Sequence, residues 1–128
     1  MQDFQRLDVW QRAHKLTLAV YRTTSEFSDV ERFGLARQVR RATSSIGANI
    51  AEGCGRDTHA DFARFLQIAA GSASELANHL LLARDLGYIK RDALRPLWSE
   101  LAEVRRMLTA LIKRVRTTNT RNITNTNN

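Results

Sequence analysis

Hydrophobic residues in this chain recur every three or four positions, which is the period of an amphipathic α-helix. Four segments carry this spacing, and short polar or glycine-containing stretches separate them. The predicted helices span about residues 8–25, 29–52, 59–86 and 91–116. Only six glycines and one proline interrupt the chain, which favours long helices over a turn-rich all-β fold.

Each predicted helix has an apolar face that can point into a shared core. In the third and fourth helices the apolar positions alternate spacings of four and three, the pattern of near-parallel bundle packing. We therefore predict an all-α fold, an antiparallel up-down four-helix bundle. The expected inward residues are Val9, Ala13, Leu16 and Val20; Leu35, Val39, Ala42, Ile46 and Ile50; Phe62, Leu66, Ala69, Ala73, Leu76, Leu80 and Ala83; and Leu94, Leu97, Leu101, Val104, Leu108, Leu111 and Val115.

Residues that favour helix ends lie between these segments. Ser28 and Glu31 form a predicted capping box, in which each side chain accepts from the other residue's backbone N–H. Thr58 is the expected N-cap of the third helix, and Gly87 is its expected end. Pro96 lies about one turn into the fourth helix and predicts either an irregular first turn or a late start of the hydrogen-bonded part.

The second predicted helix looks contacted on more than one side. Beside its apolar face it has a polar stripe and a face of small residues, where another backbone could approach closely. Polar groups beside an apolar face are either half exposed or hydrogen-bonded across helices or subunits, and we favour a homo-oligomer interface. The third helix contains a glycine in its interior, which a close neighbouring helix would explain. The candidate oligomer or inter-helix packing residues are Arg41, Ser44, Ser45, Ala48, Asn49, Glu52, Gly71 and Glu75.

Length and composition indicate one globular domain with a surplus of positive charge. The chain has 128 residues, 43% of them hydrophobic and 26% charged, and a formal net charge of +7. We expect a bundle over residues 1–116 and a disordered tail over residues 117–128, because the tail is rich in Asn and Thr and has a single apolar residue.

Six basic residues of the fourth helix project onto one arc, and a tryptophan lies among them. This pattern suits a phosphate backbone with stacking bases, but a solvated face beside the core would give the same pattern. Residues 104–128 contain six basic residues and no acid, which favours an anionic partner or counterions. The nucleic-acid-binding candidates are Arg91, Arg95, Trp98, Arg105, Arg106, Lys113 and Arg116, with Arg37 and Arg40 from the second helix.

Residues suited to catalysis or metal binding show no convincing pattern. Glu75 and His79 are four residues apart and have no second copy, whereas di-iron bundles need Glu-x-x-His twice. Cys54 is the only cysteine, so it fits a small residue at a helix end better than an interchain or redox role. We expect no enzyme activity, no metal and no cofactor. With no apolar segment long enough for a membrane helix and no leader pattern, we expect a cytoplasmic protein that does not enter a membrane.

Several motifs resemble a bacterial four-helix-bundle family that includes proteins encoded in intervening sequences of large-subunit ribosomal RNA genes. The accessory protein of diversity-generating retroelements is similar. Ser28 lies where the family often has proline, which is a minor departure. The matching motifs are Phe4-x-x-Leu7-x-Val9-Trp10, Glu31-x-Phe33-Gly34-Leu35-x-x-Gln38, Arg40-Arg41-Ala42, Ser45-Ile46-x-Ala48-Asn49-Ile50-Ala51-Glu52-Gly53 and Gly71-Ser72-x-x-Glu75-Leu76.

The resemblance implies an up-down bundle that assembles into a ring-like homopentamer. It also implies association with RNA, DNA or a nucleoprotein, such as the reverse transcriptase that the retroelement accessory protein binds. Two hypotheses follow: a non-catalytic basic oligomer that binds nucleic acid or a nucleoprotein, or a protein-interaction scaffold that binds no nucleic acid.

Overall fold

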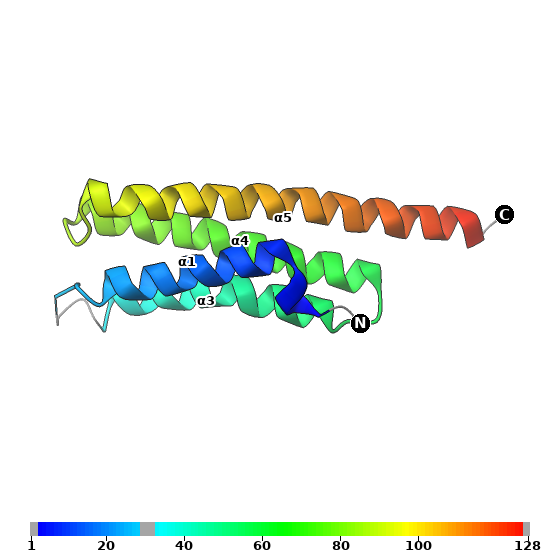
Figure 1. Cartoon of the computed structure of the whole chain (residues 1–128), viewed down its shortest axis with the longest axis horizontal. Helices are drawn as coiled ribbons and strands as arrows, with labels where there is room; N and C mark the ends of the chain where they lie inside the picture. The colour runs from blue at the N-terminus through cyan, green and yellow to red at the C-terminus, as the bar shows by residue number, and fades with distance from the viewer. Residues whose placement is uncertain (1–2, 29–32, 127–128) are drawn as a thin grey trace.

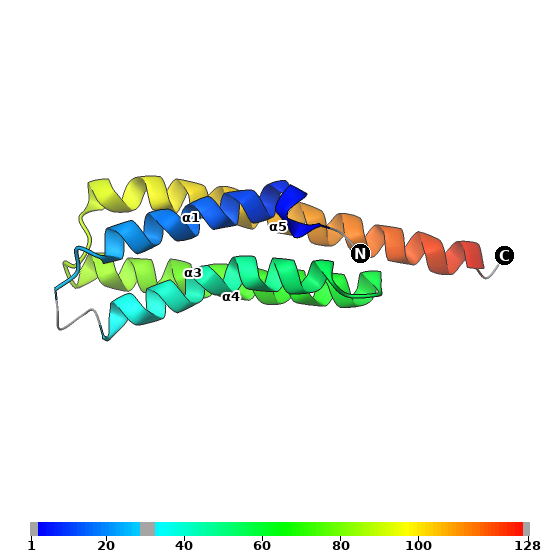
Figure 2. The same ribbon diagram turned by 60° about the horizontal axis from the view of Figure 1, so that its bottom comes forward.

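A computed structural model describes residues 3–28 and 33–126 of the chain, with side chains as far as Thr118. Within these residues a short 3-10 helix, η1 (Phe4–Arg6), precedes four α-helices. These are α1 (Asp8–Thr24), α3 (Leu35–Cys54), α4 (His59–Asp85) and α5 (Arg91–Thr126). Helices α1 and α4 each pack against both α3 and α5, so the predicted antiparallel up-down four-helix bundle is confirmed (Figures 1 and 2).

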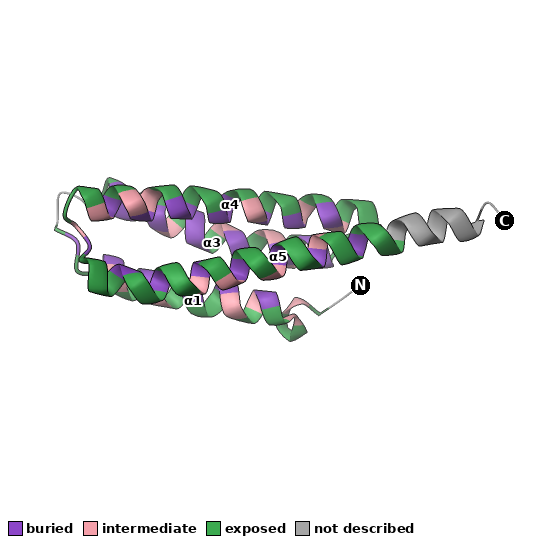
Figure 3. Ribbon diagram, turned by 90° about the horizontal axis from the view of Figure 1, so that it is seen from above, coloured by how far each residue is buried: buried purple, intermediate pink, exposed green. Residues whose placement is uncertain are grey.

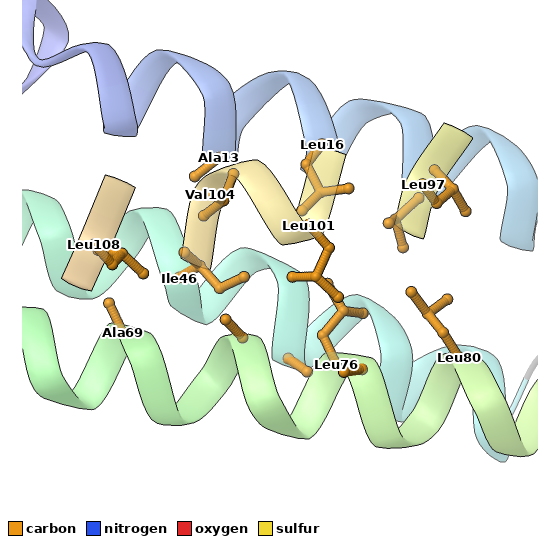
Figure 4. Packing of buried hydrophobic residues seen from close by; sticks show 14 of the residues in the cluster. Ala13, Leu16, Ile46, Ala69, Leu76, Leu80, Leu97, Leu101, Val104 and Leu108 are labelled. Atoms are coloured by element: carbon orange, nitrogen blue, oxygen red, sulfur yellow. The ribbon is translucent and has the colours of Figure 1, made fainter. Parts of the chain in front are cut away.

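The predicted apolar faces of the four helices form one continuous core. All of the expected inward residues are buried except Phe62, which is half-buried and packs against the others. Figure 4 shows Leu16, Leu76 and Leu101 from three different helices pointing into the same space. Because these positions recur at helical spacing, burying them fixes which side of each helix faces inward. The opposite sides of the helices lie exposed in Figure 3.

The ends of α4 follow the predicted signals. The Thr58 hydroxyl accepts a hydrogen bond from the backbone N–H of Asp61 at 3.1 Å, which satisfies one of the free donors of the first turn. At the other end Gly87 has φ +82°, a left-handed conformation that favours glycine. The N–H of Tyr88 then returns to the carbonyl of Ala83 at 2.9 Å and closes the helix end.

Two predicted helix starts differ from the structure. Helix α3 begins at Leu35 and not near residue 29, because Phe33 and Gly34 form a turn and glycine is a poor helix former. The predicted capping box extends into residues 29–32, which lie outside the described residues. The prediction of an irregular first turn or a late hydrogen-bonded start in α5 was wrong. Helix α5 begins at Arg91 and includes Pro96, and the N–H of Leu94 already donates to the carbonyl of Lys90.

Helix α5 continues to Thr126, beyond the predicted end at Arg116. Among the described side chains Val115 is the last that is buried, so residue 116 marks the end of core packing and not the end of the helix. Lengthening an existing helix needs no new nucleus, which is why the backbone can continue without a core. Figure 1 shows this part of α5 projecting past the other helices. Disorder of residues 117–128 in solution stays a prediction.

Candidate nucleic-acid interface

The predicted basic residues of the fourth helix all lie on the exposed side of α5. Arg91, Arg95, Arg105, Arg106, Lys113 and Arg116 are exposed, and Trp98 retains 38% of its surface in solvent. Figure 3 shows exposed residues along the length of α5. From Arg91 to Arg116 this basic stripe extends about 38 Å at the helical rise per residue.

The basic stripe borders the groove between α4 and α5, which we call the α4–α5 groove. Near the start of α5 the groove opens into a cavity of about 510 Å³, and further along into a second cavity of about 710 Å³. Between them the Arg105 guanidinium donates to the Ser74 hydroxyl at 3.4 Å, which joins the two helices. The first cavity is lined by Leu81, Arg84, Arg91, Leu94, Arg95, Trp98 and Ser99, and the second by Gln67, Ala70, Thr109, Ile112, Lys113, Arg116 and Thr117.

Carboxylates form ion pairs with some cations of the basic stripe and leave others unpaired within the described residues. Arg106 donates from Nε to Glu103 at 2.9 Å, and this hydrogen bond lowers the pKa of the Glu103 carboxyl. Arg95 and Asp92 approach only to 3.9 Å, and both side chains are largely in water, where such pairs contribute little. Arg91 and Lys113 have no ion pair within the described part of the chain. Among the described residues of the basic stripe, Arg91 and Lys113 are therefore available to an external anion, and Arg95 is only weakly paired.

The structure separates Arg37 and Arg40 from the basic stripe. Both lie on α3, which is diagonal to α5 in the bundle, and they line a different cavity with Tyr21 and Arg41. The Arg40 guanidinium is held by α1: it donates to the Thr24 hydroxyl at 2.8 Å and to the Tyr21 carbonyl at 3.1 Å. It also lies 4.8 Å from the centroid of the Tyr21 ring. Arg40 thus satisfies carbonyl and hydroxyl groups at the C-terminal end of α1, whatever else it binds.

Part of the predicted polar stripe of α3 lies between helices of the same chain. The hydroxyls of Ser45 and buried Ser72 are 2.8 Å apart, and the Asn49 amide donates to the Ser45 hydroxyl at 3.0 Å. These bonds satisfy polar groups that the packing of α3 on α4 takes out of water. For Ser45 and Asn49 an inter-helix role is enough to explain the residue types.

The other packing candidates point outward from α3 and α4. Arg41, Ser44, Ala48 and Glu52 are exposed on α3, as are Gly71 and Glu75 on α4. Glu52, a candidate for contact with another helix or subunit, pairs with Arg56 one turn further along. Glu75 lies 3.3 Å from Nε2 of His79 on its own helix. Their role in an oligomer interface stays a prediction.

Gly71 lacks the close neighbour that its sequence context suggested. A Cβ built there would meet nothing within 4 Å, whereas one at Gly53 would lie 3.0 Å from both Phe62 Cδ1 and Phe65 Cβ. We expect Gly71→Ala to raise the free energy of unfolding by about 1 kcal/mol, because alanine is the better helix former. Gly53→Ala should lower it by about 1 kcal/mol or more through overpacking. Denaturant unfolding of the two variants measures both.

The Gly71→Ala and Gly53→Ala variants also test whether subunits of this protein associate through α4. If Gly71→Ala destabilises the protein or lowers its oligomer mass, a second subunit packs against Gly71 and the explanation from helix propensity fails. Gly53 serves as the internal control, because its neighbours belong to the same chain.

The α4 side of the groove was missed by sequence reasoning. Arg84, Ser74 and Leu81 line or bridge the groove from α4, and none was a candidate. Their spacing only marks a solvent-facing side of a helix, and which helix lies beside it depends on bundle packing. Arg12 of α1 was missed for the same reason, although its guanidinium makes two hydrogen bonds to Glu100 of α5.

Groups that could support catalysis are dispersed in the described part of the chain. It contains no group of three His, Cys, Asp or Glu residues that could hold a metal ion. Cys54 ends α3 as a buried free thiol, and burial, with a smaller effect of Asp3, raises its pKa. No helix among the described residues is both long and apolar enough to cross a bilayer.

The fold and the groove define a class of protein: a four-helix bundle with a basic, aromatic-containing groove on one side. The sequence model of the 23S rRNA-intervening sequence protein family matches residues 5–110, and this chain belongs to that family. No curated protein matches the chain. It is similar to a crystal structure of a protein of unknown function from the S23 ribosomal protein family of Bacteroides thetaiotaomicron, with 26% identity and a TM-score of 0.77. That match covers 82% of this chain and 95% of the other.

Proposed function

We propose that this protein is a non-catalytic, basic, oligomeric bundle that binds nucleic acid or a nucleoprotein along the α4–α5 groove. The observation that carries the proposal is the basic stripe, in which Arg91, Arg95, Arg105 and Lys113 border one groove with an exposed tryptophan between them. Membership of a family named for ribosomal RNA intervening sequences supports a role close to nucleic acid. Such a groove offers point charges for phosphates and an aromatic face for bases.

Salt dependence tests this proposal. If the four cations each neutralise one phosphate of a single strand, the slope of log affinity against log salt should be about −3. Affinity for a labelled oligonucleotide should then fall about 50-fold as salt rises from about 50 to about 200 mM. Fluorescence anisotropy of the wild-type protein measures this. An affinity that does not change with salt contradicts phosphate binding.

Assembly is part of the proposal, since several subunits would multiply the groove. The outer face of α4 supports it, because Ile68 and Leu82 are 41% and 45% exposed there, next to Gly71 and Glu75. The family resemblance implies a homopentamer, and native mass measurement tests that number. The same family resemblance implies that the protein partner is a reverse transcriptase or another nucleoprotein.

A protein-interaction scaffold without nucleic-acid binding is the second candidate. The same exposed apolar side chains on α4 favour it, because they suit a protein surface better than a phosphate backbone. Under this alternative the purified protein is not retained on a polyanion column but binds a purified protein partner. Retention on the column at low salt and release at moderate salt favours the first proposal.

A further inference from the structure

Trp98 is the only aromatic residue of α5. The other tryptophan, Trp10, is covered: its ring stacks on His14 with centroids 4.8 Å apart and meets Phe4 edge-on at 5.1 Å. Trp98 has no such ring partner and no hydrogen bond within the described residues, and 38% of its surface is exposed. An amphipathic ring left open in this way is available to a ligand.

The surroundings of Trp98 combine an apolar floor with cations. Leu81 and Leu94 line the same 510 Å³ cavity, and Leu94 is buried. Arg91 and Arg95 also line it, two turns and one turn before Trp98 on the helix. Arg84 lines it from α4 but is bound to Asp85 at 2.9 Å. A planar aromatic ligand with phosphates on one side of it fits this arrangement.

We infer that the α4–α5 groove takes single-stranded polynucleotide, with one unpaired base stacked on the Trp98 indole. This inference rests on the proposed function and adds the class of nucleic acid. In a duplex both faces of a base are covered by neighbouring bases, and exposing one costs unstacking and unpairing energy. A single strand offers its base faces freely, and stacking on an aromatic side chain tolerates any base.

Arg91 and Arg95 hold the phosphates on one side of the stacked base. Both guanidiniums are exposed, and the Asp92 carboxylate reaches Arg95 only at 3.9 Å. Guanidinium groups bind phosphate with two parallel N–H bonds, which fixes the strand more closely than a lysine would. Lys113, which lines the second cavity, then meets the strand further along as a point charge.

The fluorescence of Trp98 tests the inference in the full-length Trp10→Phe variant, which keeps an aromatic ring at position 10. We expect oligo(dT) and oligo(rU) to quench Trp98, since both carry unpaired bases. An abasic oligonucleotide of the same length, with the same phosphates and no bases, should bind without quenching. Comparison of the affinities for oligo(dT) and oligo(rU) shows whether the groove prefers DNA or RNA. A duplex should bind more weakly than either single strand.

Two substitutions separate stacking from a structural role of Trp98. Trp98→Ala should weaken oligo(dT) binding about tenfold and leave abasic binding unchanged, whereas Trp98→Phe should keep most of the affinity. Circular dichroism melting checks that both variants fold. The inference is overturned if Trp98→Ala has no effect on oligo(dT), or if duplex binds as tightly as single strand. If neither the abasic strand nor any other polyanion binds, the proposed function itself fails.

Discussion

Replacing Arg91, Arg95 and Lys113 together by glutamine is expected to weaken oligonucleotide binding about a hundredfold at low salt. Each of these side chains borders the groove, and each phosphate contact contributes on the order of 1 kcal/mol to non-specific binding. The slope of log affinity against log salt should also become shallower by about 2, because three phosphates lose their cation. Anisotropy titrations at two salt concentrations give both quantities.

A matched triple variant controls for net charge. Arg6, Arg22 and Arg64 are exposed on η1, α1 and α4 and line neither cavity of the groove. Changing all three to glutamine removes the same charge and should reduce affinity less than about threefold. Equal losses in the two triple variants would show that binding responds to overall charge and not to the groove.

Leu76→Ala is expected to lower the free energy of unfolding by about 2–5 kcal/mol, a large part of the total stability of a domain this size. Leu76 is 0% exposed and faces the core beside Leu101 (Figure 4). The substitution removes apolar contacts and leaves a cavity that close-packed neighbours only partly fill. Chemical denaturation followed by circular dichroism measures the loss.

Leu82→Ala on the same helix is the matched control. Leu82 is 45% exposed, so the same change should alter stability by about 0.5 kcal/mol or less. If Leu82→Ala costs as much as Leu76→Ala, Leu82 is buried in an assembly. That result would weaken the assignment of α4's outer face to solvent and strengthen the proposed oligomer.

The bundle and its core could be predicted because helix burial is a local, periodic property. The seam from Leu94 to Val115 repeats at spacings of three and four, and no other element is needed to see which side is apolar. The two ends of α4, at Thr58 and Gly87, could also be predicted, because each depends on the capping chemistry of one or two residues.

The two-sided groove could not be predicted because it depends on which helices are neighbours. Arg84 and Ser74 contribute from α4 only because α4 lies beside α5. For the same reason sequence reasoning grouped Arg40 with the basic stripe, whereas its guanidinium lies against the end of α1. Neighbour relations are set by packing across the core, and one helix's pattern does not contain them.

Gly71 shows a second limit of prediction from the sequence. A glycine inside a helix suggested a close neighbour, but within the chain its outer side is open. The cost in helix propensity is therefore uncompensated in a single subunit, and only an assembly or a functional contact would offset it.

Arginine footprinting tests the central claim most directly, because the chain carries arginines on every helix. The protein is treated with phenylglyoxal with and without single-stranded oligonucleotide, and modification of each arginine is measured by mass spectrometry. We predict protection of Arg91, Arg95 and Arg105, and unchanged modification of Arg6, Arg22 and Arg64. Protection confined to arginines of α1 or α3, or no protection at a concentration where the oligonucleotide is bound, would contradict a nucleic-acid site in the α4–α5 groove.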